Sequence, residues 1–346
     1  MGDISVSKYN DVSEYLNNQA PEREAISLNY ADICRYFFST GGRQYSDNEK
    51  FMLKSDWNAA RAALNEREGY FVKSQTYEGA KSERKAFLSE KIGVLAAKAI
   101  SEKLFRIPHL FYLDDDSIEI VYGNNGALRP DYFGVNLKKD GFLFEAKGTG
   151  AREVRRQVVL KAKDQLKNIE LVNFQGVDYT ALSRYISAAR FDEKNRLVFD
   201  LIDPPAMQPE PEEDEEPKGL EIVLKEKAYL QKKYYRSIYQ LLDAQNMAAR
   251  TETVVLKGTR YLVTNVDSKI RFGLIKDIFD ILKSYQSESQ YDIYGAASED
   301  ISSILKNSPD FSVEERSRML SVGLDGILCE WRNATILGKA QIIKAK

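Results

Sequence analysis

The sequence predicts a mixed α/β fold, and three observations support that prediction. Residues 82–105 form a long, alanine-rich stretch that is typical of a helix. Residues 116–147 contain three strand-like runs separated by two turn sequences, the pattern of an antiparallel meander. A second helix, from about Arg152 to Val172, and two further strands, over 185–191 and 196–202, come next. The predicted order of elements is therefore αβββαβ, with one more strand after it.

The first predicted helix has a polar residue within its apolar face. Residues at three-and-four spacing form one stripe along it: Phe87, Glu90, Val94, Ala97 and Leu104. Glu90 is thus a charge among apolar side chains, and Glu83 at the start of the same stripe is its competitor. Gly93 would let the helix approach a sheet closely. The alternative without a functional role is that Glu90 lies at the margin of the stripe and reaches water.

The three strand-like runs cover residues 116–122, 128–137 and 142–147. The turns between them are Gly-Asn-Asn-Gly at 123–126 and Lys-Lys-Asp-Gly at 138–141, and Asn-Gly and Asp-Gly are strong hairpin signals. In the third strand the side-chain period of two places Glu145 and Lys147 on one face and the aromatic residues on the other.

The register of this predicted hairpin follows from the position of its turn. A turn centred between Lys139 and Asp140 pairs Asp131 with about Gly148, a few positions beyond Glu145. A bend or bulge near Gly134 or Gly148 would then have to bring the two carboxylates together.

The chemistry of the chain is concentrated in this hairpin. Asp131 follows Pro130, and Glu145-Ala146-Lys147 comes fourteen residues later in an apolar run. Two carboxylates that share a divalent cation, with an ammonium group nearby, suit metal-assisted hydrolysis of a phosphodiester. The alternative is an ordinary solvated strand face, but a strand this apolar is expected to be central, where charges are costly to bury.

These residues and their order resemble the PD-(D/E)xK nuclease superfamily, which has the restriction-endonuclease-like fold. The resemblance covers roughly residues 80–203. It implies that Asp131 and Glu145, with the carbonyl of Ala146, bind Mg²⁺ or Mn²⁺. Glu90 would complete the shell or bind a water, and Lys147 would orient or deprotonate the attacking water.

The resemblance makes a metal-dependent endonuclease the expected function, with DNA as the expected substrate and restriction, phage defence or repair as its setting. Two alternatives stay open. The chain could be a non-catalytic, nuclease-like subunit that binds nucleic acid in a defence complex, or an effector that cleaves RNA. A partner protein or a homodimer is compatible with each of them.

The second predicted helix is basic and starts just after the candidate site. Arg152, Arg156 and Lys163 are expected on one face, where they could track nucleic-acid phosphates. An ordinary solvated helix face is the competing interpretation. Gln165 falls on the apolar side and resembles a helix Gln found in several branches of the superfamily, although such a residue more often caps a core edge.

The length of 346 residues allows two domains, or one core domain with additional helices and strands around it. We expect a mostly helical extension over residues 1–75, the nuclease core over 76–203, an acidic Pro-rich linker over 204–219 and an α+β region over 220–346. Helices are expected near 29–38 and 56–68 in the extension. In the last region we expect helices over 224–243 and 276–285 and strands over 253–257, 261–265, 270–275 and 322–331. Recognition, dimerisation and partner binding are all open roles for it.

The net charge of −2 depends on one segment. Residues 204–219 hold six acids and one lysine, so the rest of the chain has 49 bases against 46 acids, a balance of +3. Because His109 is the only histidine, zinc fingers and Ser-His or Cys-His hydrolases are disfavoured. Cys34 and Cys329 are expected to be free, buried thiols. With neither a secretion signal nor an apolar run of membrane-spanning length, we expect a cytoplasmic protein without a membrane segment.

Overall fold

The fold is known from a computed structural model. It describes residues 1–17, 19, 21–38, 49–113, 118–122, 129–174, 176–203, 220–224, 227–246, 251–266, 268–284, 294–315 and 318–332. The acidic segment 204–219 and the turn predicted at 123–126 lie outside the described residues.

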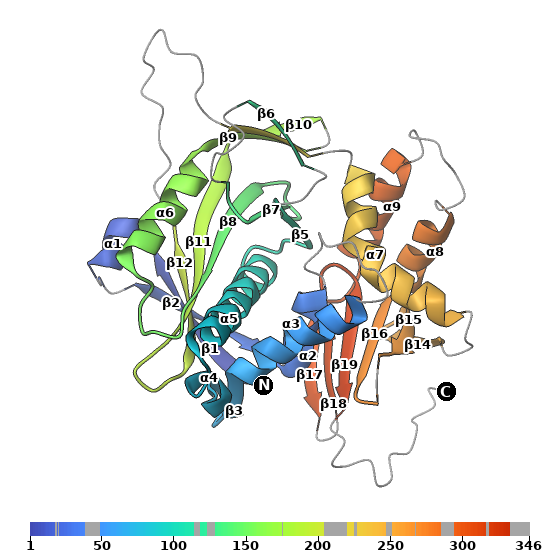
Figure 1. The fold of residues 1–346 in the computed structure, drawn as a ribbon. Helices are drawn as coiled ribbons and strands as arrows, with labels where there is room; N and C mark the ends of the chain where they lie inside the picture. Colours follow the sequence, from blue (N-terminus) through green and yellow to red (C-terminus); the bar gives the residue numbers. More distant parts are fainter. Residues whose placement is uncertain are drawn as a thin grey trace.

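A nine-stranded mixed sheet is the centre of the larger part of the molecule (Figure 1). Its strands, in hydrogen-bonded order, are β3 (Leu64–Arg67), β4 (Tyr70–Lys73), β1 (Gly2–Tyr9), β12 (Leu197–Ile202), β11 (Leu182–Phe191), β8 (Gly141–Gly148), β7 (Tyr132–Val135) and β5 (His109–Tyr112), with β2 (Glu22–Leu28) paired to β1. The mixed α/β class predicted from the sequence is confirmed, and β11 and β12 lie where strands were predicted over 185–191 and 196–202.

The N-terminal residues belong to this sheet and do not form a mostly helical extension. β1 runs parallel to β12, with Ser5 opposite Val198, and is a central strand between β12 and β4. Its alternating apolar residues Ile4 and Val6 are fully buried. The helix predicted near 29–38 is present as α2 (Tyr30–Phe38), after the short α1 (Val12–Leu16). The helix predicted over 56–68 starts and ends earlier, as α3 (Glu49–Ala63), and the residues after it form β3. The proposed boundary at residue 75 therefore cuts through one sheet.

The antiparallel meander exists, but its first strand is not the predicted one. β5, β7 and β8 form it, with Tyr112 opposite Tyr132 and Tyr132 opposite Phe144. The predicted first strand, over 116–122, is present as β6 (Ile118–Tyr122) in a separate four-stranded sheet. There β6 pairs with β13 (Leu220–Leu224), a partner about a hundred residues away that local turn signals cannot reveal.

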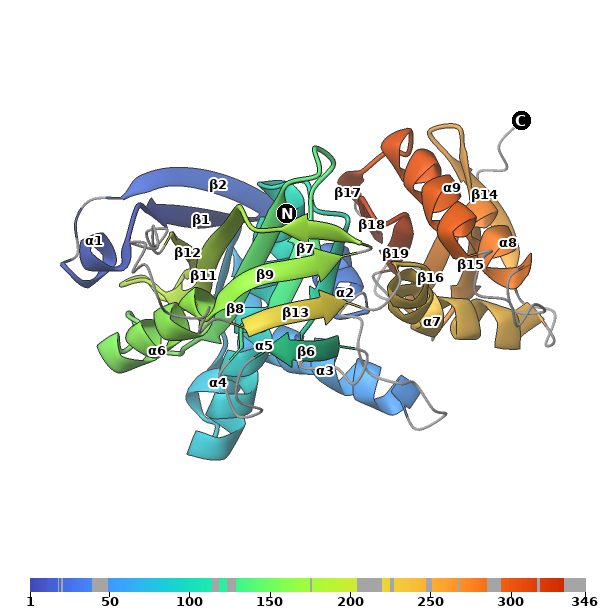
Figure 2. The same ribbon diagram turned by 90° about the horizontal axis from the view of Figure 1, so that it is seen from above.

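The four-stranded sheet has the order β10-β9-β13-β6 (Figure 2). β9 (Ile169–Phe174) and β10 (Val177–Tyr179) form a hairpin, and β9 is parallel to β13. The second helix, predicted to reach Val172, therefore ends earlier, as α6 (Arg156–Lys167). The run Ile-Glu-Leu-Val-Asn-Phe after it alternates apolar and polar residues, which suits a strand.

Two helices position the centre of the large sheet. α5 (Ser82–Lys103) covers the face of β8 that carries Phe142 and Phe144, whose rings contact Phe105 just beyond the helix. α6 lies in the crossover between the parallel neighbours β8 and β11, and the same crossover also contains β9 and β10. The short α4 (Gln75–Glu78) precedes α5.

The C-terminal region is built on a six-stranded antiparallel sheet with three helices beside it (Figure 1). The strands are β14 (Glu252–Leu256), β15 (Thr259–Asn265), β16 (Ile270–Ile275), β19 (Ile327–Arg332), β18 (Arg318–Val322) and β17 (Phe311–Glu315), and the helices are α7 (Lys227–Asn246), α8 (Lys276–Ser284) and α9 (Tyr294–Lys306). The predicted strands and helices of this region are confirmed, except that 322–331 divides into β18, a turn and β19. α9 and β17 were not predicted.

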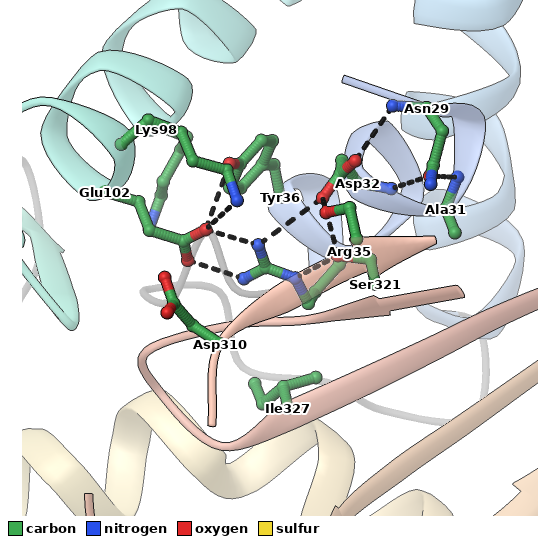
Figure 3. Close-up of polar contacts among 12 residues, drawn as sticks. Asn29, Ala31, Asp32, Arg35, Tyr36, Lys98, Glu102, Asp310, Ser321 and Ile327 are labelled. Atoms are coloured by element: carbon green, nitrogen blue, oxygen red, sulfur yellow. Dashed lines mark hydrogen bonds and ion pairs between the residues drawn. The ribbon is translucent and has the colours of Figure 1, made fainter. Parts of the chain in front are cut away.

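A buried polar cluster joins this region to the larger sheet (Figure 3). Arg35 on α2 contacts Glu102 on α5 and Ser321 on β18, and Asn29 donates to the carbonyls of Val313 and Leu320. The two regions thus share one continuous core. Cys34 and Cys329 are both buried and free, as predicted.

Candidate functional site

Asp131 and Glu145 lie directly opposite each other in the β7–β8 hairpin. The ladder ends at the pair of Tyr132 and Phe144, and one further step at the same register brings Asp131 beside Glu145. The backbone N–H of Asp131 donates to Glu145 Oε2 at 3.0 Å, and the N–H of Ala146 donates to Asp131 Oδ2 at 2.8 Å. The carboxylate of Glu145 is therefore held by the backbone at the start of β7, and the carboxylate of Asp131 by the backbone of β8.

This register corrects the one predicted from the sequence, which paired Asp131 with about Gly148. The turn is centred on Lys138, one and a half residues earlier than expected, and so the pairing moves by three positions. Asn136 sets the turn, because its Oδ1 accepts the N–H groups of Lys138 and Asp140, both at 2.9 Å. The bend or bulge expected near Gly134 or Gly148 is not needed to align the acids.

Glu145 is the most deeply buried member of the site. Its side chain is 1% exposed, whereas Asp131 is partly exposed. Burial raises the pKa of Glu145 to about 7, the negative charge of Asp131 adds to the rise, and Lys147 opposes it. A carboxyl group with these neighbours gains from a cation placed beside it.

Lys147 supplies one positive charge at the site. Its Nζ forms an ion pair with Glu145 Oε1, and its side chain is 23% exposed. Both side chains therefore point to the same face of β8, as the strand period predicted. The lysine lies between the buried acid and the solvent, where an incoming phosphate would meet it.

The helix carboxylate is less well placed than the resemblance implies. Glu90 is 58% exposed on α5 and pairs with Lys91 at 3.1 Å. Its competitor Glu83 is also exposed, in the first turn of α5. Among the residues that the structure describes, no three acid, histidine or cysteine side chains are close enough to hold a metal ion together. Direct ligation by Glu90 is thus not observed, and a water-mediated role stays a prediction.

Two glycines bring α5 against the end of β8, as the sequence suggested for Gly93. A Cβ at Gly93 would lie 2.8 Å from the carbonyl carbon of Lys147, and one at Gly148 only 1.8 Å from the carbonyl oxygen of Ser89. Only glycine fits a contact this close. The turn of α5 that carries Glu90 is therefore next to the end of β8 that carries Lys147.

Gln165 has a positioning role that the sequence did not reveal. Its Nε2 donates to the carbonyl of Arg129 at 2.9 Å, and the side chain is 9% exposed. Arg129 immediately precedes Pro130-Asp131, so α6 fixes the chain as it enters the site. A contact of Gln165 with nucleic acid remains a prediction.

The basic residues beyond Lys147 are at the surface. Arg152 and Arg156 are exposed and Lys163 is half-buried. Arg152 lies in a loop that β11 holds, through Arg190 Nη1 and the carbonyl of Arg152 at 3.2 Å. Arg190 is itself anchored by the buried Asp200, at 2.5 and 3.0 Å. Contacts of Arg152, Arg156 and Lys163 with nucleic-acid phosphates stay a prediction.

His109 has the structural role that was predicted. It is 7% exposed and its Nε2 lies 2.8 Å from the hydroxyl of Tyr235. No helix among the described residues is long and apolar enough to cross a membrane.

A scan against protein-family models and searches of the curated proteins and of the solved structures find no match. The function must therefore be inferred from the site itself.

Proposed function

We propose that this protein is a metal-dependent endonuclease of the PD-(D/E)xK type that hydrolyses phosphodiester bonds, with DNA as its substrate. The observation that carries the proposal is the cross-strand pair Asp131 and Glu145, with Lys147 on the same face as Glu145. A structural role alone gives no reason to place two acids opposite each other when one is buried and has a raised pKa.

The residues present fit Mg²⁺ or Mn²⁺. Mg²⁺ is usually held by one or two carboxylates and completes its shell with water and substrate phosphate oxygens. Asp131 and Glu145, with the carbonyl of Ala146, are a ligand set of that kind, and Glu90 could join through water. A cation bound there would act as a Lewis acid on the phosphate.

The chain's own residues would divide the remaining tasks. Lys147 would orient the attacking water and offset the negative charge that develops on the phosphate. Gln165 would keep Asp131 in place through the backbone of Arg129. Arg152, Arg156 and Lys163 would hold the nucleic-acid backbone near the site.

The test is cleavage by the purified chain of supercoiled plasmid, linear DNA, single strands and RNA, with Mg²⁺, Mn²⁺ or EDTA. Asp131→Asn, Glu145→Gln and Lys147→Ala should each abolish cutting, whereas Glu193→Gln in the exposed turn between β11 and β12 should not. Cutting that survives in all three site variants would refute the proposal. Cutting of RNA alone would keep the site and change the substrate.

A second function is favoured by one specific observation. No third carboxylate among the described residues lies close enough to Asp131 and Glu145 to share a metal ion with them, and a nuclease-like subunit that binds nucleic acid without cutting it would need none. Metal-independent binding with no cleavage of any substrate would support this alternative. It would not explain why Asp131 and Glu145 are paired.

A further inference from the structure

A second cavity adjoins the candidate site and is lined by unpaired lysines. It has a volume of about 390 Å³ and lies between β4, α4, the first turns of α5 and the loop after β8. Its lining includes Lys73, Tyr77, Lys85, Ser89 and Thr149. The residues come from four segments, so no local sequence pattern marks the cavity.

The charge of the cavity is positive and is not neutralised by ion pairs. Neither Lys73 nor Lys85 has an ion pair within 4.0 Å among the described residues, although Lys73 Nζ lies over the ring of Phe191, 5.0 Å from its centroid, and Glu78 also lines the cavity. Burial lowers the pKa of Lys73, and the positive charges of Lys85 and Arg152 lower it further, against the opposing effect of Glu78. Two lysines thus share the lining with one carboxylate, that of Glu78, and the net charge of +1 can be balanced by an anion.

The polar groups of the cavity suit a phosphate. The hydroxyls of Tyr77 and Ser89 are 2.6 Å apart and both line the space. Gly150 is needed there, because a Cβ at this position would lie 2.2 Å from the Tyr77 hydroxyl. Hydroxyl groups and lysines are the usual protein contacts of backbone phosphates.

A larger cavity elsewhere provides a contrast. It has a volume of about 520 Å³ and is lined by two arginines and two glutamates. Arg318 is paired with Glu315 at 2.9 Å, and Glu314 pairs with the N-terminal amine. The charges of that space balance, so it offers no comparable attraction for an anion.

The position of the lysine cavity relates it to the nuclease site. Thr149 is two residues beyond Lys147, which is about 7 Å along an extended strand. The cavity is therefore at the same end of β8 as Lys147, on the side of the strand that α5 covers. Ser89 precedes Glu90 on the turn of α5 that touches Gly148.

We propose that the cavity of Lys73, Lys85, Tyr77 and Ser89 binds a nucleic-acid phosphate next to the one cleaved at Asp131, Glu145 and Lys147. This inference is based on the proposed function, since it names the part of the substrate that the neighbouring pocket takes. The bound phosphate is either an internal one or a 5′-terminal one.

The test measures binding separately from cleavage, with labelled oligonucleotide duplexes in EDTA over a series of salt concentrations. Lys73→Gln/Lys85→Gln should bind about 10- to 100-fold more weakly than wild type, and its log–log salt slope should fall by about 1 to 2. Lys73→Arg/Lys85→Arg should restore most of the binding. The matched control Lys138→Gln/Lys306→Gln removes two exposed lysines from the β7–β8 turn and from α9, and should bind like wild type.

Further comparisons separate the possible outcomes. A loss confined to 5′-phosphorylated duplexes identifies the terminal phosphate, and an equal loss with 5′-hydroxyl duplexes identifies an internal one. Circular dichroism and thermal unfolding verify that the double variant is folded.

Binding and salt slope equal to those of the control would overturn the inference, even if wild type cuts DNA and Asp131→Asn does not. If neither wild type nor any variant cuts DNA, the binding comparison still tests whether the cavity binds a phosphate. The two proposals can therefore fail independently.

Discussion

Arg35 and Glu102 form a buried ion pair in which both Nη atoms of the guanidinium bond to the two carboxylate oxygens, at 2.7 and 2.6 Å (Figure 3). Arg35 is on α2 and Glu102 near the end of α5. The third nitrogen of the guanidinium, Nε, donates to Ser321 Oγ at 2.8 Å, and Asp325 Oδ1 lies 3.6 Å from Nη1. One side chain thus connects α2, the helix behind the candidate site and the C-terminal sheet.

Removing one partner of this pair should be costly. We expect Arg35→Met to lower the free energy of unfolding by about 3 to 5 kcal/mol, because the Glu102 charge would stay buried without its partner. The double variant Arg35→Met/Glu102→Leu should lose clearly less than the sum of the two single changes. Urea unfolding of the four proteins measures this coupling, and strictly additive losses would contradict it.

Lys98, at the same junction, should make the free energy of unfolding depend on pH above about 7. Burial lowers its pKa to about 7, although Asp325 and Glu102 oppose the change, and its Nζ donates to the carbonyl of Leu110 at 3.1 Å. Between that value and the ordinary pKa near 10.5, the unfolded chain binds more protons than the folded one, so stability should rise with pH.

The variant Lys98→Met should lack this rise. Between about pH 7 and pH 10 wild type should gain about 2 to 5 kcal/mol relative to the variant. Unfolding midpoints measured in parallel across the pH range give the difference. Identical slopes for the two proteins would show that Lys98 does not titrate in that window.

The sequence predicted the local elements well because each has a local cause. Apolar periodicity placed α5, β8, β11 and β12, and the Asp140-Gly141 pair marked the turn region, whereas the role of Asn136 in that turn was not predicted. Pairings over long distances had no such signal. β1 joins β12, and β6 joins β13, through contacts between segments about a hundred or more residues apart.

The candidate site shows the same division. Asp131, Glu145 and Lys147 could be read from one hairpin, and only the turn position had to be corrected. Whether Glu90 belongs to the site depends on how far the side chains of α5 extend toward it, and the spacing of residues in the sequence does not give that distance. Lys73 and Lys85 come from separate elements, and only the folded chain brings them together.

The contact of α5 with β8 yields a graded prediction. Gly148→Ala should destabilise the protein by about 3 kcal/mol or more and abolish any nuclease activity, because its Cβ would overlap the carbonyl oxygen of Ser89. Gly93→Ala should cost less, since its closest contacts are 2.8 to 3.0 Å and alanine favours a helix by about 1 kcal/mol.

The control for this pair is Gly79→Ala, whose nearest neighbour would be 3.4 Å away in ordinary contact. It should leave the melting temperature within about 2 °C of wild type, whereas Gly148→Ala should lower it by at least about 5 °C. Equal melting temperatures for Gly148→Ala and Gly79→Ala would mean that α5 does not press on β8.

Glu145 should make the metal-free protein less stable as pH rises. Because burial and Asp131 raise its pKa to about 7, the folded chain binds a proton more tightly than the unfolded one, whose ordinary value is near 4.5. The stabilisation is complete below about pH 4.5 and is lost as pH rises through about 7. In EDTA, wild type should therefore lose about 3 kcal/mol relative to Glu145→Gln across this range.

The same measurement separates a metal site from a merely buried acid. Near pH 8, where Glu145 is ionised, Mg²⁺ at a hundred times its dissociation constant should return about 2.7 kcal/mol to wild type. Glu145→Gln should gain little, because it lacks one of the two carboxylates, and Glu193→Gln in the exposed turn between β11 and β12 should respond like wild type. If Mg²⁺ and Mn²⁺ raise the unfolding midpoint of Glu145→Gln as much as that of wild type, the cation binds elsewhere, and the cross-strand pair of Asp131 and Glu145 is not its site.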